Sequence, residues 1–280
     1  MAKKEKNIKE QEQQPAPLLP AKIFEGSVLT LVPENEFDMQ GTSEATRYCP
    51  GRVKIMTGGI EMFQFPNDKT VKFFQAFLLH KSRTRGYYRD DVVQPGRMPD
   101  CWSADAAFPN SDVSWCPLTE GPLKGMKVSC ASCPMSVFKS DPKGKRGQAC
   151  KERLNTHFFY AGPDPDLESG IPYQISLPPT SLRAMDEYCT GLIGAGIPMQ
   201  TVVTNVSLVH AQNQAGQGYS KLTLARGGRI SKPEEHRLKA YFLQLVPLFK
   251  SQPMTSEDFE EAPVHDPEGA GTDFDFQKGA

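Results

Sequence analysis

Cysteines in the middle of the chain have the spacing of a metal site. Cys130 and Cys133 form a C-x-x-C pair in "SCASCP", and Cys150 follows 17 positions later, after the stretch "KSDPKGKRG". Sulfurs at this spacing can reach one ion, and thiolates suit tetrahedral zinc. The fourth ligand is Cys101 in "MPDCWSAD" or Cys116 in "SWCPLTEG", and the spacing does not choose between them. We therefore expect one structural Zn²⁺ ion.

Other uses of these cysteines fit the sequence less well. A redox C-x-x-C normally opens a helix after a buried strand, whereas this pair lies in a polar segment bounded by proline. A deaminase site would need a His-x-Glu, and the chain has none; the HExxH and Walker-A patterns are also missing. The adjacent pair Asp90 and Asp91 is too little for a metal-dependent nuclease. We expect a protein that is not an enzyme.

The elements that must position these cysteines can be read along the chain. The stretches "VKIMTGGIEMFQF" and "TVKFFQAFLLHK" have the composition of strands, and "NTHFFYA" with "IPYQISLP" predicts a hairpin. A second hairpin is predicted for "TVVTNVSLVHA" and "YSKLTLAR", and a helix for "TSLRAMDEYCTGLIGAG", which makes Cys189 a core residue. A last helix begins at a capping box of Ser231 and Glu234, and its apolar face comprises Leu238, Tyr241, Phe242, Leu245 and Phe249.

Three regions follow from composition. We expect a disordered leader over residues 1–21 and a single domain over residues 22–250, with a zinc-binding insertion at about 92–153. A disordered acidic tail is expected over residues 251–280. The N-terminal "MAKKEKNIKEQEQQ" lacks the apolar segment of a secretion signal, and the chain has no apolar stretch of membrane-spanning length. We expect a cytoplasmic protein with no membrane partner.

Charge is spread unevenly along the 280 residues. The chain has 32 Lys and Arg against 33 Asp and Glu, a net charge of −1. The last 30 residues have eight acids and Lys278, which gives 1 − 8 = −7, so the rest has −1 + 7 = +6. A basic body with an acidic tail is common among nucleic-acid-binding proteins, because the tail can compete for the same groove.

Basic and aromatic residues alternate near the cysteines, as a groove for single-stranded nucleic acid requires. The phenylalanines Phe73, Phe77, Phe158 and Phe159 are expected in the core instead. The candidate contacts are Lys81, Arg83, Arg85, Tyr87, Tyr88, Arg89, Trp102, Lys139, Lys143, Lys145, Arg146, Lys151 and Arg153.

The order of several segments resembles a family of phage and mobile-element proteins, the zinc-containing single-stranded DNA-binding proteins. The segments are "GRVKI…GG", "PDCWSAD", "CASCP", "KGKRGQACKERLNTHFFY", "ISLPPTSLRAM", "VVTNVSLVHAQN" and "GYSKLTLARGG", over about residues 50 to 250. The resemblance implies Cys101, Cys130, Cys133 and Cys150 as zinc ligands, with Cys116 as an extra cysteine. It also implies an OB-like barrel, and the Phe-containing acidic tail looks like tails that recruit replication partners.

These observations together predict a mainly β fold with a few helices, an OB-like barrel with an inserted structural zinc loop. The expected function is single-stranded DNA binding in phage or mobile-element replication or recombination, with location in the host cytoplasm if a phage encodes the protein. The expected partners are single-stranded DNA and, through the tail, replication or recombination proteins. The alternative is a zinc-ribbon interaction or transcription-regulatory protein that binds duplex DNA or another protein.

Overall fold

The structure is a computed structural model that describes residues 49–56, 60–90, 96–141, 147–162, 164, 166–167, 171–212 and 218–259. The predicted leader, the loop residues Lys143, Lys145 and Arg146, and the chain beyond Phe259 lie outside these residues.

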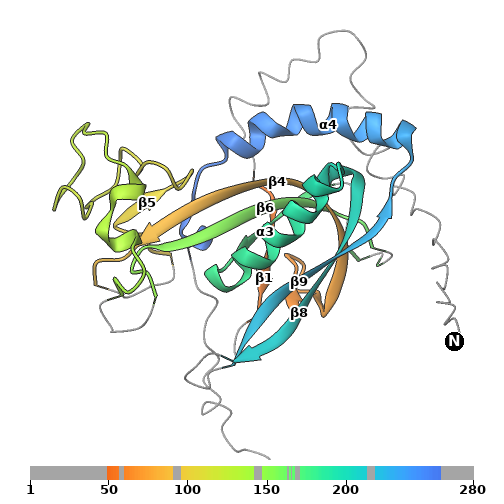
Figure 1. Cartoon of the computed structure of the whole chain (residues 1–280), viewed down its shortest axis with the longest axis horizontal. Coiled ribbons are helices and arrows are strands. Elements are labelled where there is room, and N and C mark those ends of the chain that lie inside the picture. The colour runs from red at the N-terminus through yellow and green to blue at the C-terminus, as the bar shows by residue number, and fades with distance from the viewer. Residues whose placement is uncertain are drawn as a thin grey trace, which may run out of the picture.

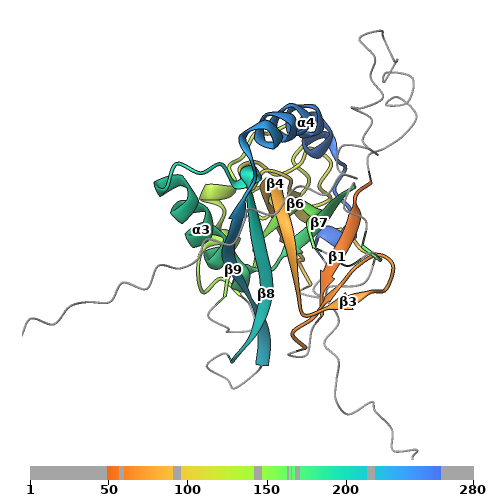
Figure 2. The same cartoon turned by 90° about the vertical axis from the view of Figure 1, so that its right-hand side faces the viewer.

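One curled sheet forms most of the fold, and it has the shape of a half-barrel (Figures 1 and 2). Its main path runs in the order β3-β2-β1-β7-β6-β4-β8-β9, and β5 pairs with β4 in addition. Strand β1 runs parallel to β7, and the other pairs are antiparallel. The strands are β1 (Gly51–Ile55), β2 (Phe63–Gln64), β3 (Thr70–Val71), β4 (Phe73–Tyr87), β5 (Cys101–Ser103), β6 (Lys151–Tyr160), β7 (Pro172–Leu177), β8 (Val202–Gln212) and β9 (Gly218–Arg229).

Strands β4 and β6 are the centre of the sheet and extend beyond it toward the cysteines. Their register places Phe77 opposite Phe159 and Arg85 opposite Glu152, with a register shift between Leu78 and His80. Aromatic residues dominate the inner part of both strands, with Leu78 and Leu79 in β4, where the sheet is covered on its two faces. Phe77, Phe158 and Phe159 are core residues as predicted, but Phe73 is 69% exposed, which corrects that prediction.

Helix α3 (Pro179–Gly194) covers one face of the sheet (Figure 1). It buries Met185, Cys189 and Leu192, which follow each other at helical spacing and contact the core cluster that includes Phe74 and Phe158. Phe74 stacks on Phe158 with ring centroids 5.1 Å apart. The predicted core position of Cys189 is confirmed.

Helix α4 (Lys232–Ser251) covers the opposite face. Leu238, Leu245 and Phe249 are buried in a second cluster with Phe77 and Phe159 of the sheet. The predicted apolar pattern is confirmed at these positions, while the side chains of Glu234 and Tyr241 are not among those described. Among the described residues, neither this helix nor any other has the length and apolar character needed to cross a membrane.

A C-terminal strap, which we define as residues 252–259, follows α4 and packs on the sheet. It contains the short 3-10 helix η5 (Ser256–Asp258), whose Asp258 is completely buried. Phe259 is 3% exposed and lies against Gly86, where an added Cβ would meet the Phe259 ring at 2.6 Å. The tail was expected to begin at residue 251, which is too early, because these residues belong to the folded body.

Asp258 is held by a polar cluster that explains why the strap is ordered. Arg52 donates to Oδ1 of Asp258 at 2.6 Å, and Gln174 and Asn155 donate to the same oxygen at 2.7 and 3.3 Å. The backbone N–H of Thr255 donates to Oδ2 at 2.8 Å. A buried charge is stable only when it is paired and hydrogen-bonded in this way.

The predicted mainly β fold with a few helices is therefore confirmed at this level, with a curled sheet between two α-helices. The long interval between β4 and β6 builds a separate lobe at one end of the molecule (Figure 1).

Candidate metal centre and adjoining groove

The cysteine-rich lobe, which we define as residues 96–150, is inserted between the paired ends of β4 and β6. Strand β5 attaches the lobe to the sheet by placing Cys101 opposite Tyr87. Backbone hydrogen bonds fix other cysteines: Cys130 donates to Ala107 at 2.9 Å, and Cys150 donates to the carbonyl of Met135 at 2.8 Å. The lobe is thus held by its backbone at several of its cysteines.

Five cysteines of the lobe line one small cavity of about 20 Å³. They are Cys101, Cys116, Cys130, Cys133 and Cys150, all of them free thiols. Each is at most 9% exposed, and the rest of the lining is Tyr87, Pro109, Pro117, Leu118 and Ser136. The structure therefore brings together the four expected ligands and also the alternative, Cys116.

Burial acts against ionisation of these thiols. It raises the pKa of Cys150 to about 12, and it raises the pKa of Cys130 and Cys133 as well. The pKa of Cys101 is raised by burial and by the neighbouring Cys116, Cys150 and Cys130. The positive charge of Arg85 opposes this effect at Cys130, Cys133 and Cys150.

The C-x-x-C segment is folded so that sulfur can accept hydrogen bonds. Two short 3-10 helices, η2 (Cys130–Ser132) and η3 (Pro134–Ser136), turn the chain around this pair. The sulfur of Cys133 accepts from the backbone N–H groups of Met135 and Ser136. Such donors stabilise a thiolate more than a thiol and orient it toward a metal.

The residues fit a thiophilic divalent ion, although they are not arranged as a finished coordination sphere. Within the described residues, no group of three or more His, Cys, Asp or Glu side chains forms a ready set of metal ligands. Two nitrogens of Arg85, Nε and Nη1, are buried without a hydrogen-bond partner among these residues. Buried donors beside a group of thiols are complementary to an anionic thiolate centre, and a set of sulfur ligands favours Zn²⁺.

No family model, curated protein or solved structure matches this chain. What the lobe and its surroundings can bind must follow from their own residues.

A groove of about 660 Å³ lies where the lobe faces the sheet. The sheet contributes His80, Lys81, Ser82, Arg83, Asn155 and His157, and the lobe contributes Ala104, Asp105, Phe108, Pro109, Asn110 and Ser111. The third side is the end of α4 and the strap, with Phe249, Lys250, Gln252 and Met254. The metal cavity and this groove share Pro109, so one lobe forms both.

The edge of β4 along this groove has no strand beside it. The pairing with β8 ends at Ala76 and the pairing with β5 begins at Arg85, both on the edge opposite β6. Between these points no described strand pairs with that edge of β4. Side chains from both faces of the strand can therefore reach the groove, as Lys81 and Ser82 do.

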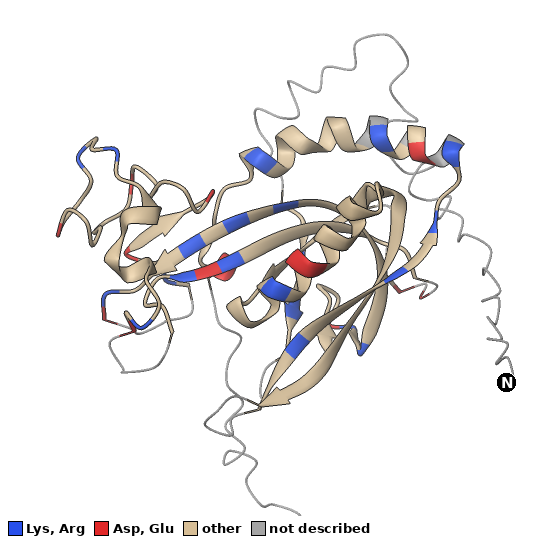
Figure 3. Cartoon of the chain, viewed as in Figure 1, with Lys and Arg blue, Asp and Glu red and all other residues tan. Residues whose placement is uncertain are grey.

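The groove has cationic groups and one exposed aromatic ring. Figure 3 shows Lys and Arg residues along the long central strands of the sheet. Lys81 and Arg83 belong to β4, and Lys250 is exposed at the end of α4. Arg83 also pairs with Glu152 and, at 2.5 Å, with Asp186 of α3. Phe108 is 57% exposed on the lobe side.

Asp105 holds the loop that presents Phe108. Its Oδ1 accepts hydrogen bonds from the backbone N–H groups of Ala107 and Phe108 at 2.8 and 3.0 Å, and from the Ser103 hydroxyl at 2.9 Å. Partial burial alone would raise the pKa of Asp105, but these donors outweigh it and lower the pKa. The loop is thus fixed by an ionised carboxylate, and the ring of Phe108 stays exposed.

On the sheet side of the groove, the imidazole of His157 is uncharged at neutral pH. Burial lowers the pKa of His157 to about 4, and its ring stacks on Phe249 with centroids 4.3 Å apart. Its Nε2 is 2.8 Å from Oε1 of Gln252 in the strap. Asn155 is 3% exposed, and its Oδ1 has no hydrogen-bond partner among the described residues.

The predicted nucleic-acid contacts are distributed over several places, and Lys81 and Arg83 are the ones that line the groove. Tyr87 is 8% exposed, lines the metal cavity and stacks on Trp115, so the predicted stacking role of Tyr87 is corrected. Arg153 is 5% exposed and is likewise not a surface contact. Both positions belong to strands that continue into the lobe, where residues on each face become covered.

The other predicted contacts that the structure describes lie on the lobe or beside it, outside the groove. Tyr88 donates to the carbonyl of Arg97 at 3.2 Å, and Arg89 lies over the ring of Trp115 at 5.7 Å. Trp102 is near Phe259 of the strap, with ring centroids 6.3 Å apart. Lys139 is exposed, and Lys151 pairs with Asp141 at 3.1 Å. Arg85 faces the thiols and pairs with Glu152 at 2.7 Å.

Phe108 and Lys250, the exposed ring and an exposed cation of the groove, are not among the contacts that the sequence predicts. Phe108 lies in "DAAFPNSD", where an acid three positions earlier and a following proline indicate a turn that exposes the ring. Lys250 has no such local signal. It reaches the groove because α4 ends there, which the residues around it in the sequence do not indicate.

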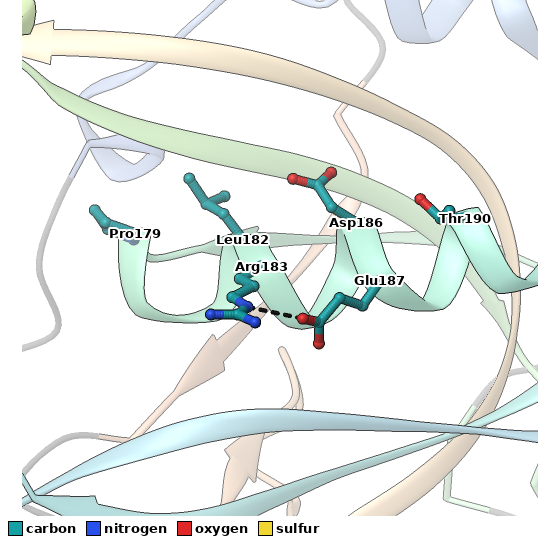
Figure 4. Close-up of a pocket in the computed structure, with 6 residues that line it drawn as sticks. All are labelled: Pro179, Leu182, Arg183, Asp186, Glu187 and Thr190. Atoms are coloured by element: carbon teal, nitrogen blue, oxygen red, sulfur yellow. Dashed lines mark hydrogen bonds and ion pairs between the residues drawn. The ribbon is translucent and has the colours of Figure 1, made fainter.

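A second hollow, of about 560 Å³, runs along the outer face of α3 (Figure 4). Its charged groups are already paired: Arg183 binds Glu187 at 2.7 Å, and Asp186 binds Arg83. Pro179, Leu182 and Thr190 complete the lining. Because these charged groups already bind each other, they are poor partners for a ligand. The groove is therefore the better candidate site.

Proposed function

We propose that this protein binds single-stranded DNA in the groove between the cysteine-rich lobe and the sheet, and that it is not an enzyme. The observation that carries the proposal is the combination of exposed Phe108 with Lys81 and Lys250 around one groove. Lysines attract phosphates, and an exposed ring can stack on an unpaired base of any identity. Its place in phage or mobile-element replication or recombination follows from the family resemblance of the sequence.

The proposal includes one zinc ion that supports the lobe side of the groove. Cys130, Cys133, Cys150 and Cys101 would hold it, with Cys101 as the fourth ligand because the family resemblance of the sequence implies it; Cys116 lines the same cavity. Bound zinc would supply folding free energy to the lobe and no reaction chemistry. The N–H groups of Met135 and Ser136 would orient the sulfur of Cys133.

We also propose that the curled sheet serves as an OB-like barrel does, by presenting a strand-lined surface to unpaired nucleotides. The stretch of the β4 edge beside Lys81 and Ser82, which pairs with no described strand, supports this. The acidic chain beyond Phe259 is proposed to recruit replication or recombination proteins.

The test is a fluorescence-anisotropy titration with labelled oligo-dT and with a duplex of equal length. Single strands should bind, with an affinity that falls with salt by a slope of about −0.7 for each neutralised phosphate. Phe108→Ala should weaken binding by about 1 to 3 kcal/mol without changing the slope, and Lys81→Gln or Lys250→Gln should flatten it.

Arg183→Ala is the matched control, because Arg183 is exposed on α3 in the hollow outside the groove. Its binding should equal that of the unchanged protein. Equal affinity for duplex and single strand would reject the proposal, and so would a Phe108→Ala protein with unchanged affinity.

One observation favours the alternative, a zinc-ribbon protein that binds another protein. Val137 and Phe138 are 59% and 62% exposed, side by side on the lobe just after η3. Neighbouring exposed apolar side chains are typical of a protein contact. Under this alternative, Phe138→Ser would abolish partner binding, and oligo-dT would not bind at any salt concentration.

A further inference from the structure

Arg85 occupies an unusual position for a residue on a strand near the surface. Its side chain is 17% exposed, and one nitrogen, Nη2, donates to Oε2 of Glu152 at 2.7 Å. The other two nitrogens, Nε and Nη1, are buried and lack a hydrogen-bond partner among the described residues. Guanidinium N–H groups cannot lose their charge by deprotonation, so leaving two of them unpaired is costly.

The guanidinium of Arg85 is near the metal cavity. The charge of Arg85 acts electrostatically on the thiols of Cys130, Cys133 and Cys150, which all line that cavity. It does so from the sheet, since Arg85 and the cavity-lining Tyr87 are alternate residues of β4 and therefore share a face. The sheet thus supplies a fixed cation to a site whose candidate ligands belong to the lobe.

Glu152 holds this cation in place. It lies directly opposite Arg85 in the β4–β6 pair, and its second oxygen binds Arg83. Arg83 is in turn bound to Asp186 of α3 at 2.5 Å. The guanidinium of Arg85 is therefore attached to a chain of ion pairs that leads back to the body.

The missing partner of Arg85 should be an anion. Zn²⁺ bound by four thiolates has a formal charge of 2 − 4 = −2, and the thiolate sulfurs still accept hydrogen bonds. A cation that donates two N–H groups matches such a centre in charge and in hydrogen bonding.

We propose that Arg85 is a positioning residue of the metal centre, which neutralises part of the tetrathiolate charge and donates N–H groups to sulfurs of the C-x-x-C pair and Cys150. This proposal rests on the metal site of the proposed function. It reassigns Arg85, which the sequence predicts as a nucleic-acid contact, from the groove to the lobe. It also makes zinc affinity depend on a residue outside the cysteine-rich lobe.

The test uses the full chain, with zinc measured by mass spectrometry and its affinity measured by competition with a chromophoric chelator. Arg85→Met removes the charge while keeping an apolar stem, and we expect it to lower zinc affinity by about 10- to 100-fold. In protein loaded with Co²⁺, the thiolate-to-cobalt charge-transfer band should move to longer wavelength, because the sulfurs lose their hydrogen bonds.

Lys81→Met is the matched control, because Lys81 is a cation on the same strand and lines the groove. We expect its zinc affinity and cobalt spectrum to equal those of the unchanged protein. If Arg85→Met does not fold, Arg85→Lys replaces it. The ammonium of lysine has one nitrogen on a shorter side chain, so this variant should still weaken zinc binding.

The outcomes separate the two proposals. A wild-type chain that binds no zinc would overturn the metal site itself. A wild-type chain that binds zinc, together with position-85 variants that equal the wild type in affinity and cobalt spectrum, would overturn the role of Arg85 alone.

Discussion

The five thiols around one cavity raise the question of which four would hold the proposed zinc ion. We propose Cys101 as the fourth ligand, as the family resemblance of the sequence implies. We expect Cys116→Ser to keep one zinc ion per chain, and Cys101→Ser to lose it. Cys130→Ser and Cys133→Ser should also release zinc, and they should lower the free energy of unfolding of the lobe by several kcal/mol.

Metal analysis of the purified variants, together with thermal unfolding, checks this prediction. Cys189→Ser, on the buried face of α3, is the control that should keep the metal although it changes a buried thiol. If Cys116→Ser lost zinc and Cys101→Ser kept it, Cys116 would be the ligand.

His157 should make the fold sensitive to acid. Its pKa is about 4 in the folded protein, because of burial, against about 6.5 in the unfolded chain. The unfolded chain therefore binds more protons between these values, so stability is complete above pH 6.5 and is lost as the pH falls toward 4. The expected loss is about 3 kcal/mol.

Urea unfolding at a series of pH values measures this loss. The groups that face the His157 ring include His80, Phe249 and Gln252, and Asp258 and Arg52 act on it electrostatically. His157→Gln removes the titrating group, so its stability should depend less on pH in this window. A variant with the same pH dependence as the wild type would contradict the prediction.

The packing of the strap on the sheet depends mainly on one buried carboxylate, that of Asp258. Asp258→Ala would leave Arg52 without its closest partner and would leave the amides of Gln174 and Asn155 without an acceptor. Breaking a buried ion pair from one side costs about 3 to 5 kcal/mol, and we expect a loss of that size in urea unfolding.

Glu257→Gln provides the comparison for Asp258→Ala. Glu257 also pairs with Arg52, at 3.1 Å, but its side chain is 46% exposed. Exposed pairs contribute about 0 to 1 kcal/mol, so this variant should be nearly as stable as the wild type. Equal losses in the two variants would show that burial of Asp258 does not matter.

Elements with a clear period could be predicted from the sequence. The α4 helix follows from Leu238, Leu245 and Phe249 at helical spacing, and the strands follow from their β-branched and aromatic residues. The outer half of β4 could not be predicted as strand, because Lys81, Arg83 and Arg85 resemble a solvated loop. Glu152 and Asp186, distant in sequence, compensate these charges, and a single sequence does not reveal such pairs.

The thiols of the candidate site could be predicted from the sequence, but the groove beside them could not. Cysteine spacing restricts which sulfurs can meet, and all five candidates line one cavity. The groove instead requires the lobe, the sheet and the end of α4 to come together, as Phe108, Lys81 and Lys250 do. Only the tertiary arrangement determines that contact.

Two truncations distinguish the strap from the acidic chain that follows it. Ending the protein after Phe259 keeps every strap contact described here, so we expect an unchanged melting temperature. Ending it after residue 250 removes Asp258 and Phe259, which are both buried, and should lower the melting temperature by many degrees. Circular dichroism of the two proteins makes the comparison.

The same truncations test the proposed competition between tail and DNA. Residues 260–280 have six acids and one lysine, a net charge of 1 − 6 = −5. Removing them should tighten single-strand binding at low salt and have less effect at high salt, where charges are screened. Weaker binding after this removal would contradict a competing role.

The insertion of the lobe between two paired strands has a consequence for the order of folding. Gly86 and Lys151 are register partners, although 151 − 87 − 1 = 63 residues separate β4 from β6. The free-energy cost of closing a loop grows only by about 0.6 kcal/mol for each doubling of its length. A connection as long as this lobe is therefore tolerated between two paired strands. The β4–β6 ribbon can form first, with the lobe condensing afterwards as a late cooperative unit. Amide hydrogen exchange without metal should therefore speed up in the lobe while the inner halves of β4 and β6 stay protected.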